Sequence, residues 1–230
     1  MRSNGNRLDP YARARERMIE LLASRGISDA RVLEAMRRIP RHEFVPEPFT
    51  SRSYGDHALS IGADQTISQP YMVALMSQLL ELTPESRVLE IGAGSGYQTA
   101  ALAMMAKYVY AIERIASLSR DAMARLRALR ITNATIKCFD GTIGWSEHAP
   151  YDAILVAAAA REVPVPLAAQ LADGGRLVIP LGDPGGQELV RLIRRGDSFT
   201  RASFGPVRFV AFMGDYGDRQ IGRASCRERV

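Results

Sequence analysis

The chain has 230 residues, of which 47% are hydrophobic, and its formal net charge at pH 7 is +5. This length and apolar content suffice for one sizeable core, so we expect a single domain. The sequence contains no run of about 18 apolar residues such as a membrane-spanning helix needs, and its polar N-terminus does not resemble a signal peptide. Lysine and arginine are interspersed with acidic residues, which argues against a nucleic-acid surface. Two cysteines are too few for a disulfide framework and fit a cytoplasmic protein.

The last ten residues, IGRASCRERV, have no apolar periodicity. Their back-translation as ATC GGA AGA GCG TCG TGT AGG GAA AGA GTG matches a common sequencing adapter. We therefore interpret residues 221–230 as a non-native tail that packs against nothing, and residues 1–220 as the single domain. An ordinary disordered basic tail is the alternative.

Two amphipathic helices are predicted near the N-terminus. Asp9-Pro10 has the composition of a helix start, and Gly26 ends the apolar pattern that follows. Ser28 is expected to cap the second helix, which must end near Pro40 because a helix interior excludes proline. A proline-rich connector is expected over residues 42–49.

Residues 51–69 mix glycine, aspartate and serine with isolated apolar residues, and we interpret them as an ordered loop. Proline at position 70 suits the first turn of a third helix. The apolar residues that follow at helical spacing are Met72, Leu75, Met76, Leu79 and Leu80.

From Arg87 onward, short apolar runs alternate with helical segments, which predicts a parallel sheet with helices on both faces. Gly196-Asp197 separates two later β-rich stretches and predicts a hairpin. The expected fold class is α/β, with a doubly wound, mostly parallel sheet, an antiparallel C-terminal hairpin and N-terminal helices. The expected strands are VLEI, YVYAI, ATIKCF, YDAILV, RLVIPLG and the two β-rich stretches at 187–195 and 199–212; the expected helices are 97–105, 115–129 and 165–171, and Gly174-Gly175 is the expected turn before RLVIPLG.

The segment VLEIGAGSGYQTA places Gly92, Gly94 and Gly96 between a strand and a helix. Glycine permits positive φ angles and close approach of a ligand to the backbone, and a helix N-terminus favours negative groups. The spacing G-x-G-x-G, preceded by Glu90, differs from the dinucleotide fingerprint G-x-G-x-x-G and favours the methyltransferase version. A glycine triplet alone is weak evidence.

Acidic residues follow the next two expected strands. Glu113 ends one strand and could accept hydrogen bonds from ribose hydroxyls, while Asp140-Gly141 follows the next and could accept from an adenine amine. Taken singly, Glu113 fits a solvated strand tip and Asp140-Gly141 an ordinary turn. Three such strand ends in this order indicate an adenosine-containing ligand at the carboxyl edge of the sheet.

Six segments together resemble the successive motifs of the protein-L-isoaspartate O-methyltransferase family over residues 18–214. They are TISQPYMVALM, VLEIGAGSGYQTA, VYAIER, FDGTIGWSEHAPYDAILVAAAA, LADGGRLVIPLG and VRFV. The glycine loop and acidic strand ends are shared by methyltransferases in general. The TISQP segment and the run before the strand YDAILV therefore narrow the resemblance to this one family. The resemblance implies a Rossmann-like methyltransferase fold, with an N-terminal helical and substrate-loop segment at 8–82 and a cofactor-binding core at 83–214.

The resemblance also implies the site. Ser68 matches the position of the family's active-site serine, although it could instead cap the helix at Pro70. Ala211 and Phe212 depart from the proline and branched aliphatic residue usual after VRFV, which leaves the shape of one pocket wall open. The implied contacts to S-adenosyl-L-methionine are Glu90, Gly92, Gly94, Gly96, Glu113, Asp140 and Gly141; the implied substrate contacts are Gln65, Thr66, Ile67, Ser68, Gln69, Ala158, Val210 and Ala211.

The implied reaction transfers a methyl group from S-adenosylmethionine to the α-carboxylate of L-isoaspartyl residues in damaged proteins and peptides, which initiates repair through a succinimide. We expect a monomer that uses no metal and binds neither nucleic acid nor a membrane. His42, His57 and His148 are scattered among loops without metal-ligand spacing. The alternatives are a methyltransferase of the same fold that acts on a small molecule or RNA, and a non-catalytic nucleotide-binding module.

Overall fold

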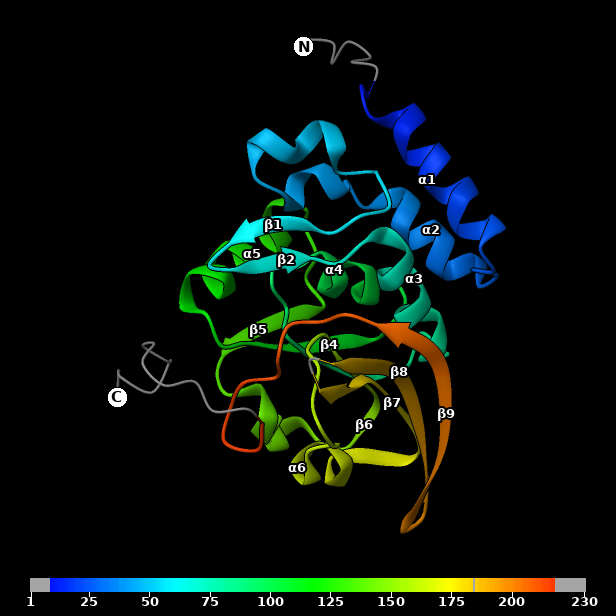
Figure 1. The fold of residues 1–230 in the computed structure, drawn as a ribbon. Helices are drawn as coiled ribbons and strands as arrows, with labels where there is room; N and C mark the ends of the chain where they lie inside the picture. The colour runs from blue at the N-terminus through cyan, green and yellow to red at the C-terminus, as the bar shows by residue number, and fades with distance from the viewer. Residues whose placement is uncertain (1–8, 184, 218–230) are drawn as a thin grey trace.

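The computed structural model describes residues 9–183 and 185–217. Its central feature is a seven-stranded sheet with the order β5-β4-β3-β6-β7-β8-β9 (Figure 1). Pairing is parallel from β5 through β7 and antiparallel for β8 and β9. The predicted fold class is therefore confirmed. The strands are β3 (Arg87–Ile91), β4 (Tyr108–Glu113), β5 (Ala134–Cys138), β6 (Tyr151–Val156), β7 (Leu171–Asp183), β8 (Gly186–Arg195) and β9 (Ser198–Val207).

The strand order reverses at β3. From β3 the chain adds β4 and β5 on one side and then returns to add β6 on the other side. Such a reversal leaves a crevice at the carboxyl ends of the strands, where ligands of open parallel sheets bind. The helices that accompany this part of the chain are α4 (Tyr97–Ala103), α5 (Ala116–Ala128) and α6 (Val165–Ala169).

The predicted N-terminal helices are present as α1 (Ala12–Ser24) and α2 (Ala30–Arg38), and the third as α3 (Pro70–Leu79). α1 begins two residues later than expected, although Asp9 still accepts the Tyr11 N–H at 2.9 Å. The expected cap at Ser28 is wrong, because the Asp29 carboxylate accepts the Arg31 N–H and caps α2. The Ser28 N–H instead donates to the Gln78 side chain, which joins the start of α2 to α3.

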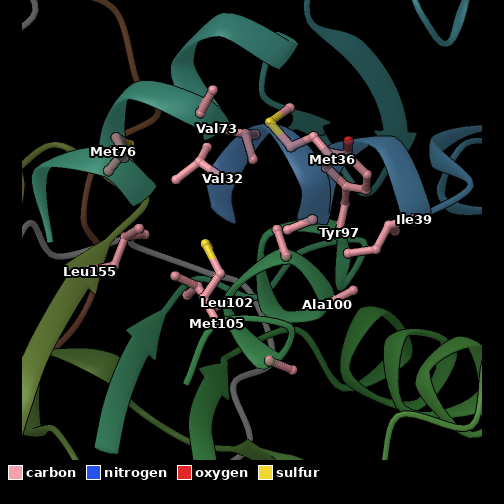
Figure 2. Packing of buried hydrophobic residues seen from close by; sticks show 14 of the residues in the cluster. Val32, Met36, Ile39, Val73, Met76, Tyr97, Ala100, Leu102, Met105 and Leu155 are labelled. Atoms are coloured by element: carbon pink, nitrogen blue, oxygen red, sulfur yellow. The ribbon is translucent and has the colours of Figure 1, made fainter. Parts of the chain in front are cut away.

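These helices pack onto one face of the sheet. Figure 2 shows Val32 and Met36 of α2 and Val73 and Met76 of α3 gathered above Leu155 of β6, in one apolar cluster with α4. The five side chains are almost inaccessible to solvent, so the helices lose a large apolar area if they detach. A second buried cluster covers the other face of the sheet around Leu89, Ile154 and Phe212.

The region expected to be a connector and a loop contains regular structure. The connector forms two short 3-10 helices, η1 (Arg41–Phe44) and η2 (Glu47–Arg52), and the expected loop contains a hairpin of β1 (Leu59–Gly62) and β2 (Gln65–Ile67). The hairpin turns through Ala63 and Asp64, which both adopt positive φ angles. Neither residue provides the usual glycine signal of such a turn.

The last strands begin and end elsewhere than predicted. β7 starts at Leu171, with one residue between it and α6, and includes the Gly174-Gly175 pair that was expected to precede it. β9 ends at Val207, so residues 208–212 leave the sheet and cross the cavity described below. No helix within residues 9–183 and 185–217 is long and apolar enough to cross a membrane. The interpreted tail at 221–230 lies outside the described residues.

Candidate functional site

A cavity of about 1240 Å³ opens at the carboxyl ends of β3, β4 and β6. The turn after β3, the end of β4 and the residues after β6 form one side, and the β2–α3 segment and the chain after β9 form the remaining walls. Pockets for a single small ligand measure about 300–1,000 Å³. This cavity therefore has room for a cofactor and part of a second reactant.

The glycine turn after β3 has two functions. Gly92 (φ 88°) and Gly94 (φ 54°) line the cavity in a backbone conformation that favours glycine. Gly96 (φ 87°) lies at the N-terminal end of α4 and is not part of the lining. A Cβ added to Gly96 would lie 3.1 Å from the Cβ of Ala122, so its missing side chain lets α4 pack against α5.

Glu113 joins the end of β4 to this turn. One carboxylate oxygen accepts the Gly94 N–H at 2.9 Å and the other accepts the Ile115 N–H at 2.8 Å. Burial raises the pKa of Glu113, and the two backbone donors oppose that shift. A carboxylate has about four acceptor positions, so Glu113 retains capacity to bind ligand hydroxyls from the cavity wall.

Glu90 lies beneath the site and does not line the cavity. It is fully buried, and neither carboxylate oxygen has a hydrogen-bond partner within the described part of the chain. Burial, together with the nearby charge of Glu113, raises its pKa to about 8, and the Thr99 hydroxyl opposes this shift. A carboxyl with such a pKa is mostly protonated at neutral pH.

Asp140 and Gly141 have separate positions. Gly141 lines the cavity, and a Cβ there would lie 2.4 Å from Cγ2 of Ile91, which excludes any larger residue without rearrangement. Asp140 does not line the cavity. One of its oxygens accepts the Thr142 N–H and hydroxyl at 2.9 and 2.7 Å, and the other accepts the Asp215 N–H at 2.9 Å. The carboxylate thus fixes the segment that follows Phe212.

The predicted substrate loop lines the same cavity as the glycine turn. All five residues from Gln65 to Gln69 line the cavity, and Ser68 is half-buried. The alternative role of Ser68 as a helix cap is wrong, because Gln69 occupies the cap position of α3 and no side chain caps this helix. The Ser68 carbonyl accepts a hydrogen bond from Arg41 at 2.7 Å.

The residues after β6 and the chain after β9 pair with each other in the wall of the cavity. The Ala159 N–H donates to Val210 at 2.8 Å, and the Phe212 N–H donates to Ala159 at 2.7 Å. This pairing exposes Ala211 and buries Phe212, which belongs to the second buried cluster on the other face of the sheet. Of the two unusual residues after VRFV, Ala211 therefore presents a small side chain at the cavity wall, and the aromatic side chain of Phe212 fixes this segment to the sheet.

The structure brings most of the predicted site residues to one cavity. The cavity includes Gly92, Gly94, Glu113, Gly141, Ala158, Val210 and Ala211 together with residues 65–69. Glu90, Gly96 and Asp140 lie behind or beside it. Sequence reasoning missed Tyr97, which lines the cavity, and Arg41 behind Ser68. The position of Tyr97 directly after the glycine turn was a usable signal; Arg41, between Pro40 and the proline-rich connector, gave none.

The histidines do not form a metal centre in the structure. His42 stacks on Tyr11 and contacts the Tyr54 hydroxyl at 2.9 Å, and His148 stacks on Tyr110. Among the described residues, no group of three or more histidine, cysteine, aspartate and glutamate side chains could hold a metal ion.

The fold and this site define an S-adenosylmethionine-dependent methyltransferase of class I. A profile of the family described as protein-L-isoaspartate(D-aspartate) O-methyltransferase matches residues 13–217. The chain belongs to this family.

Relatives and solved structures agree with that assignment. The chain is 50% identical over 207 residues to a protein-L-isoaspartate O-methyltransferase of Dictyoglomus thermophilum, covering 90% of this chain and 94% of that protein. Identity to the protein of the same name from Methylorubrum extorquens is 55% over 208 residues, covering 90% and 91%. A solved protein-L-isoaspartate O-methyltransferase superposes with a TM-score of 0.82 at 30% identity, covering 88% of this chain and 67% of that one. A Plasmodium falciparum chain named as a candidate member, in complex with S-adenosyl-L-homocysteine, gives 0.76 at 29% identity, covering 86% and 98%.

Proposed function

We propose that this enzyme transfers a methyl group from S-adenosylmethionine to the free α-carboxylate of L-isoaspartyl residues in damaged proteins and peptides. The observation that carries the proposal is the single cavity that joins the Gly92–Gly94 turn and Glu113 to the Ser68 loop. A methyl donor on one side and a carboxylate on the other would meet inside it. The methyl ester then cyclises to a succinimide, and hydrolysis of that ring returns some normal aspartate.

The residues at the strand ends fit the cofactor. Gly92, Gly94 and Gly141 present backbone without side chains to the cavity, and Glu113 presents a carboxylate with free acceptor positions for ribose hydroxyls. Bound S-adenosylmethionine supplies an electrophilic methyl group on a sulfonium. Asp140 does not line the cavity and accepts the Asp215 N–H, so we assign to it the fixing of residues 213–217, and to Gly141 the wall beside the base.

Ser68 would orient the substrate. Its hydroxyl can donate to the isoaspartyl carboxylate, which has a pKa near about 3.5 and is ionised at neutral pH. The reaction therefore needs no strong general base, which agrees with a cavity lining without histidine. In-line positioning in a site that excludes water supplies the acceleration. Gln65 to Gln69, Ala158, Val210 and Ala211 form the walls that hold the peptide.

We further infer that the enzyme acts as a monomer in the cytoplasm and does not bind nucleic acid. The sequence feature behind the last part of this inference is that lysine and arginine are interspersed with acidic residues and form no long basic block.

The proposal is tested by radiolabelled methyl transfer to an isoaspartyl peptide, with the matched aspartyl peptide as the control. The two peptides have the same atoms but present different carboxyl groups to the donor. A displacement of about 1 Å can cost roughly a hundred-fold in rate, so we expect turnover on the isoaspartyl peptide alone. Equal rates on both would overturn the substrate assignment. Methylation of RNA or a small molecule in place of the peptide would favour the alternative of a methyltransferase with such a substrate. Cofactor binding without methyl transfer would favour a non-catalytic nucleotide-binding module.

A further inference from the structure

Arg41 is a fully buried arginine that contacts the proposed substrate loop. It belongs to η1, and its relative exposure is 0%. Nε donates to the Ser53 carbonyl at 2.7 Å, and Nη2 donates to the Ser68 carbonyl at 2.7 Å. The guanidinium also lies over the ring of Tyr97, 4.7 Å from its centroid. One side chain therefore connects the residue that we assign to substrate orientation with a cavity residue on α4.

Burial of this cation is costly. Within the described residues, no carboxylate lies within ion-pair distance of Arg41, and its Nη1 has no hydrogen-bond partner. The Tyr97 hydroxyl, also buried, has none either. Removing a charge from water carries a large free-energy penalty, and an apolar side chain of similar volume would fill the space without that penalty. The two short bonds to loop carbonyls are the specific interactions that an apolar residue would lose.

A second contact fixes the chain just after Ser68, at the start of α3. The Asp56 carboxylate accepts the Tyr71 N–H at 2.9 Å and pairs with Arg25, the residue that follows α1. The guanidinium of Arg25 in turn lies over the Tyr71 ring, 3.6 Å from its centroid. The stretch from Ser68 to Tyr71 is thus held at its first carbonyl by Arg41 and at its last N–H by Asp56. Only the first of these contacts reaches Ser68 and the cavity residue Tyr97.

We propose that Arg41 is a positioning residue for methyl transfer, which holds the Ser68 hydroxyl at a fixed distance from the cofactor side of the cavity. This inference rests on the proposed function. Arg41 acts through the Ser68 backbone and through Tyr97, and it touches neither reactant. Its loss should therefore lower kcat for the isoaspartyl peptide and leave the affinity for the cofactor unchanged.

The test compares Arg41→Lys with wild type. Lysine keeps the charge but lacks the planar fork that reaches two carbonyls at once. Arg191→Lys is the control: Arg191 also contacts a carbonyl (Leu79) and an aromatic ring (Phe204) and has a buried nitrogen without a partner within the described residues. It differs in its ion pair with Glu81, and it lies on β8 outside the cavity lining. We expect a loss of roughly ten- to a hundred-fold in kcat for Arg41→Lys, an unchanged Kd for S-adenosylhomocysteine, and wild-type kcat for Arg191→Lys. Thermal unfolding of both variants separates lost stability from lost turnover.

A double-mutant cycle with Ser68→Ala decides whether Arg41 acts through Ser68. If it does, Arg41→Lys should lower kcat little further once the hydroxyl is absent. Full additivity of the two effects, or a kcat of wild-type size in Arg41→Lys, would overturn the inference about Arg41. The proposed function would still stand in either case, provided that the wild-type enzyme methylates the isoaspartyl peptide. A wild-type enzyme without isoaspartyl activity would overturn both. Arg41→Met extends the series where it folds; if it fails to fold, the lysine variant and the cycle still give the answer.

Discussion

The Glu113 carboxylate accepts a hydrogen bond from the Gly94 N–H at 2.9 Å. This bond joins the end of β4 to the turn after β3, and the second oxygen joins the same strand end to the start of α5 through the Ile115 N–H. Glu113 thereby sets the shape of the turn that forms one side of the cavity. Its replacement should disturb both the turn and the contacts to a ribose.

The first prediction is that Glu113→Ala weakens S-adenosylmethionine binding by about ten-fold or more. Hydrogen bonds to a charged group contribute roughly 1.5–3 kcal/mol each, and the variant also releases the Gly94 N–H. Titration calorimetry measures the change. Glu85→Ala is the control, because Glu85 is an exposed glutamate paired with Lys107 on the surface. Wild-type affinity in Glu113→Ala would remove this residue from the binding site.

The second prediction concerns Gly141→Ala. The new Cβ would lie 2.4 Å from Cγ2 of the buried Ile91, and overpacking of this kind costs about 1–3 kcal/mol. Because both residues line the cavity, cofactor affinity should fall together with the melting temperature. Gly186→Ala is the matched control, since a Cβ at Gly186 meets nothing within 4 Å. Equal melting temperatures for the two variants would contradict the assigned close contact.

The strand ends were predictable from the sequence because their signals are local. β3, β4 and β5 are short runs rich in apolar residues: Gly92 follows β3 directly, Glu113 ends β4, and Asp140-Gly141 follows β5 after one residue. In parallel sheets these ends meet at one edge whatever the details of packing. The order of strands and motifs was therefore enough to bring Gly92, Glu113 and Gly141 together.

Features that depend on distant partners were not predictable. The hairpin of β1 and β2 is short, and its turn at Ala63 and Asp64 lacks the glycine that usually marks positive φ angles. Arg41 is a charged residue between a predicted helix and a connector, a position typical of solvent exposure; in the structure it is buried and donates to carbonyls 12 and 27 residues away. Asp140 is drawn away from the cavity by Asp215, 75 residues later.

The third prediction concerns residues 221–230. Deletion of this segment should leave the melting temperature and the rate on an isoaspartyl peptide unchanged, because the sequence has no apolar face to bury. Differential scanning calorimetry and the methyl-transfer assay measure the two quantities on the full and shortened chains. A loss of either would show that the segment belongs to the protein and refute the adapter interpretation.

The last prediction concerns Glu90, whose pKa burial raises from 4.5 to about 8. Between these values the unfolded chain has released the proton that the folded chain still holds. The folded state then binds more protons than the unfolded state, so stability falls as pH rises through this window and levels off above about pH 8.

Glu90→Gln replaces the titrating carboxyl by an amide, so it should remove the contribution of Glu90 to the pH dependence of the unfolding free energy. One pKa unit corresponds to about 1.4 kcal/mol, so between about pH 5.5 and pH 8 wild type should lose on the order of 2–3 kcal/mol of unfolding free energy relative to the variant. Urea unfolding of both proteins at the two pH values measures this difference, and titrating groups common to both cancel in it. Glu113 is the charged neighbour whose pKa the variant would also shift, and Glu113→Gln in both backgrounds controls for that contribution. Parallel stability curves for wild type and Glu90→Gln would mean that Glu90 is ionised in the folded protein at neutral pH, and that the buried carboxylate has a partner which compensates its charge.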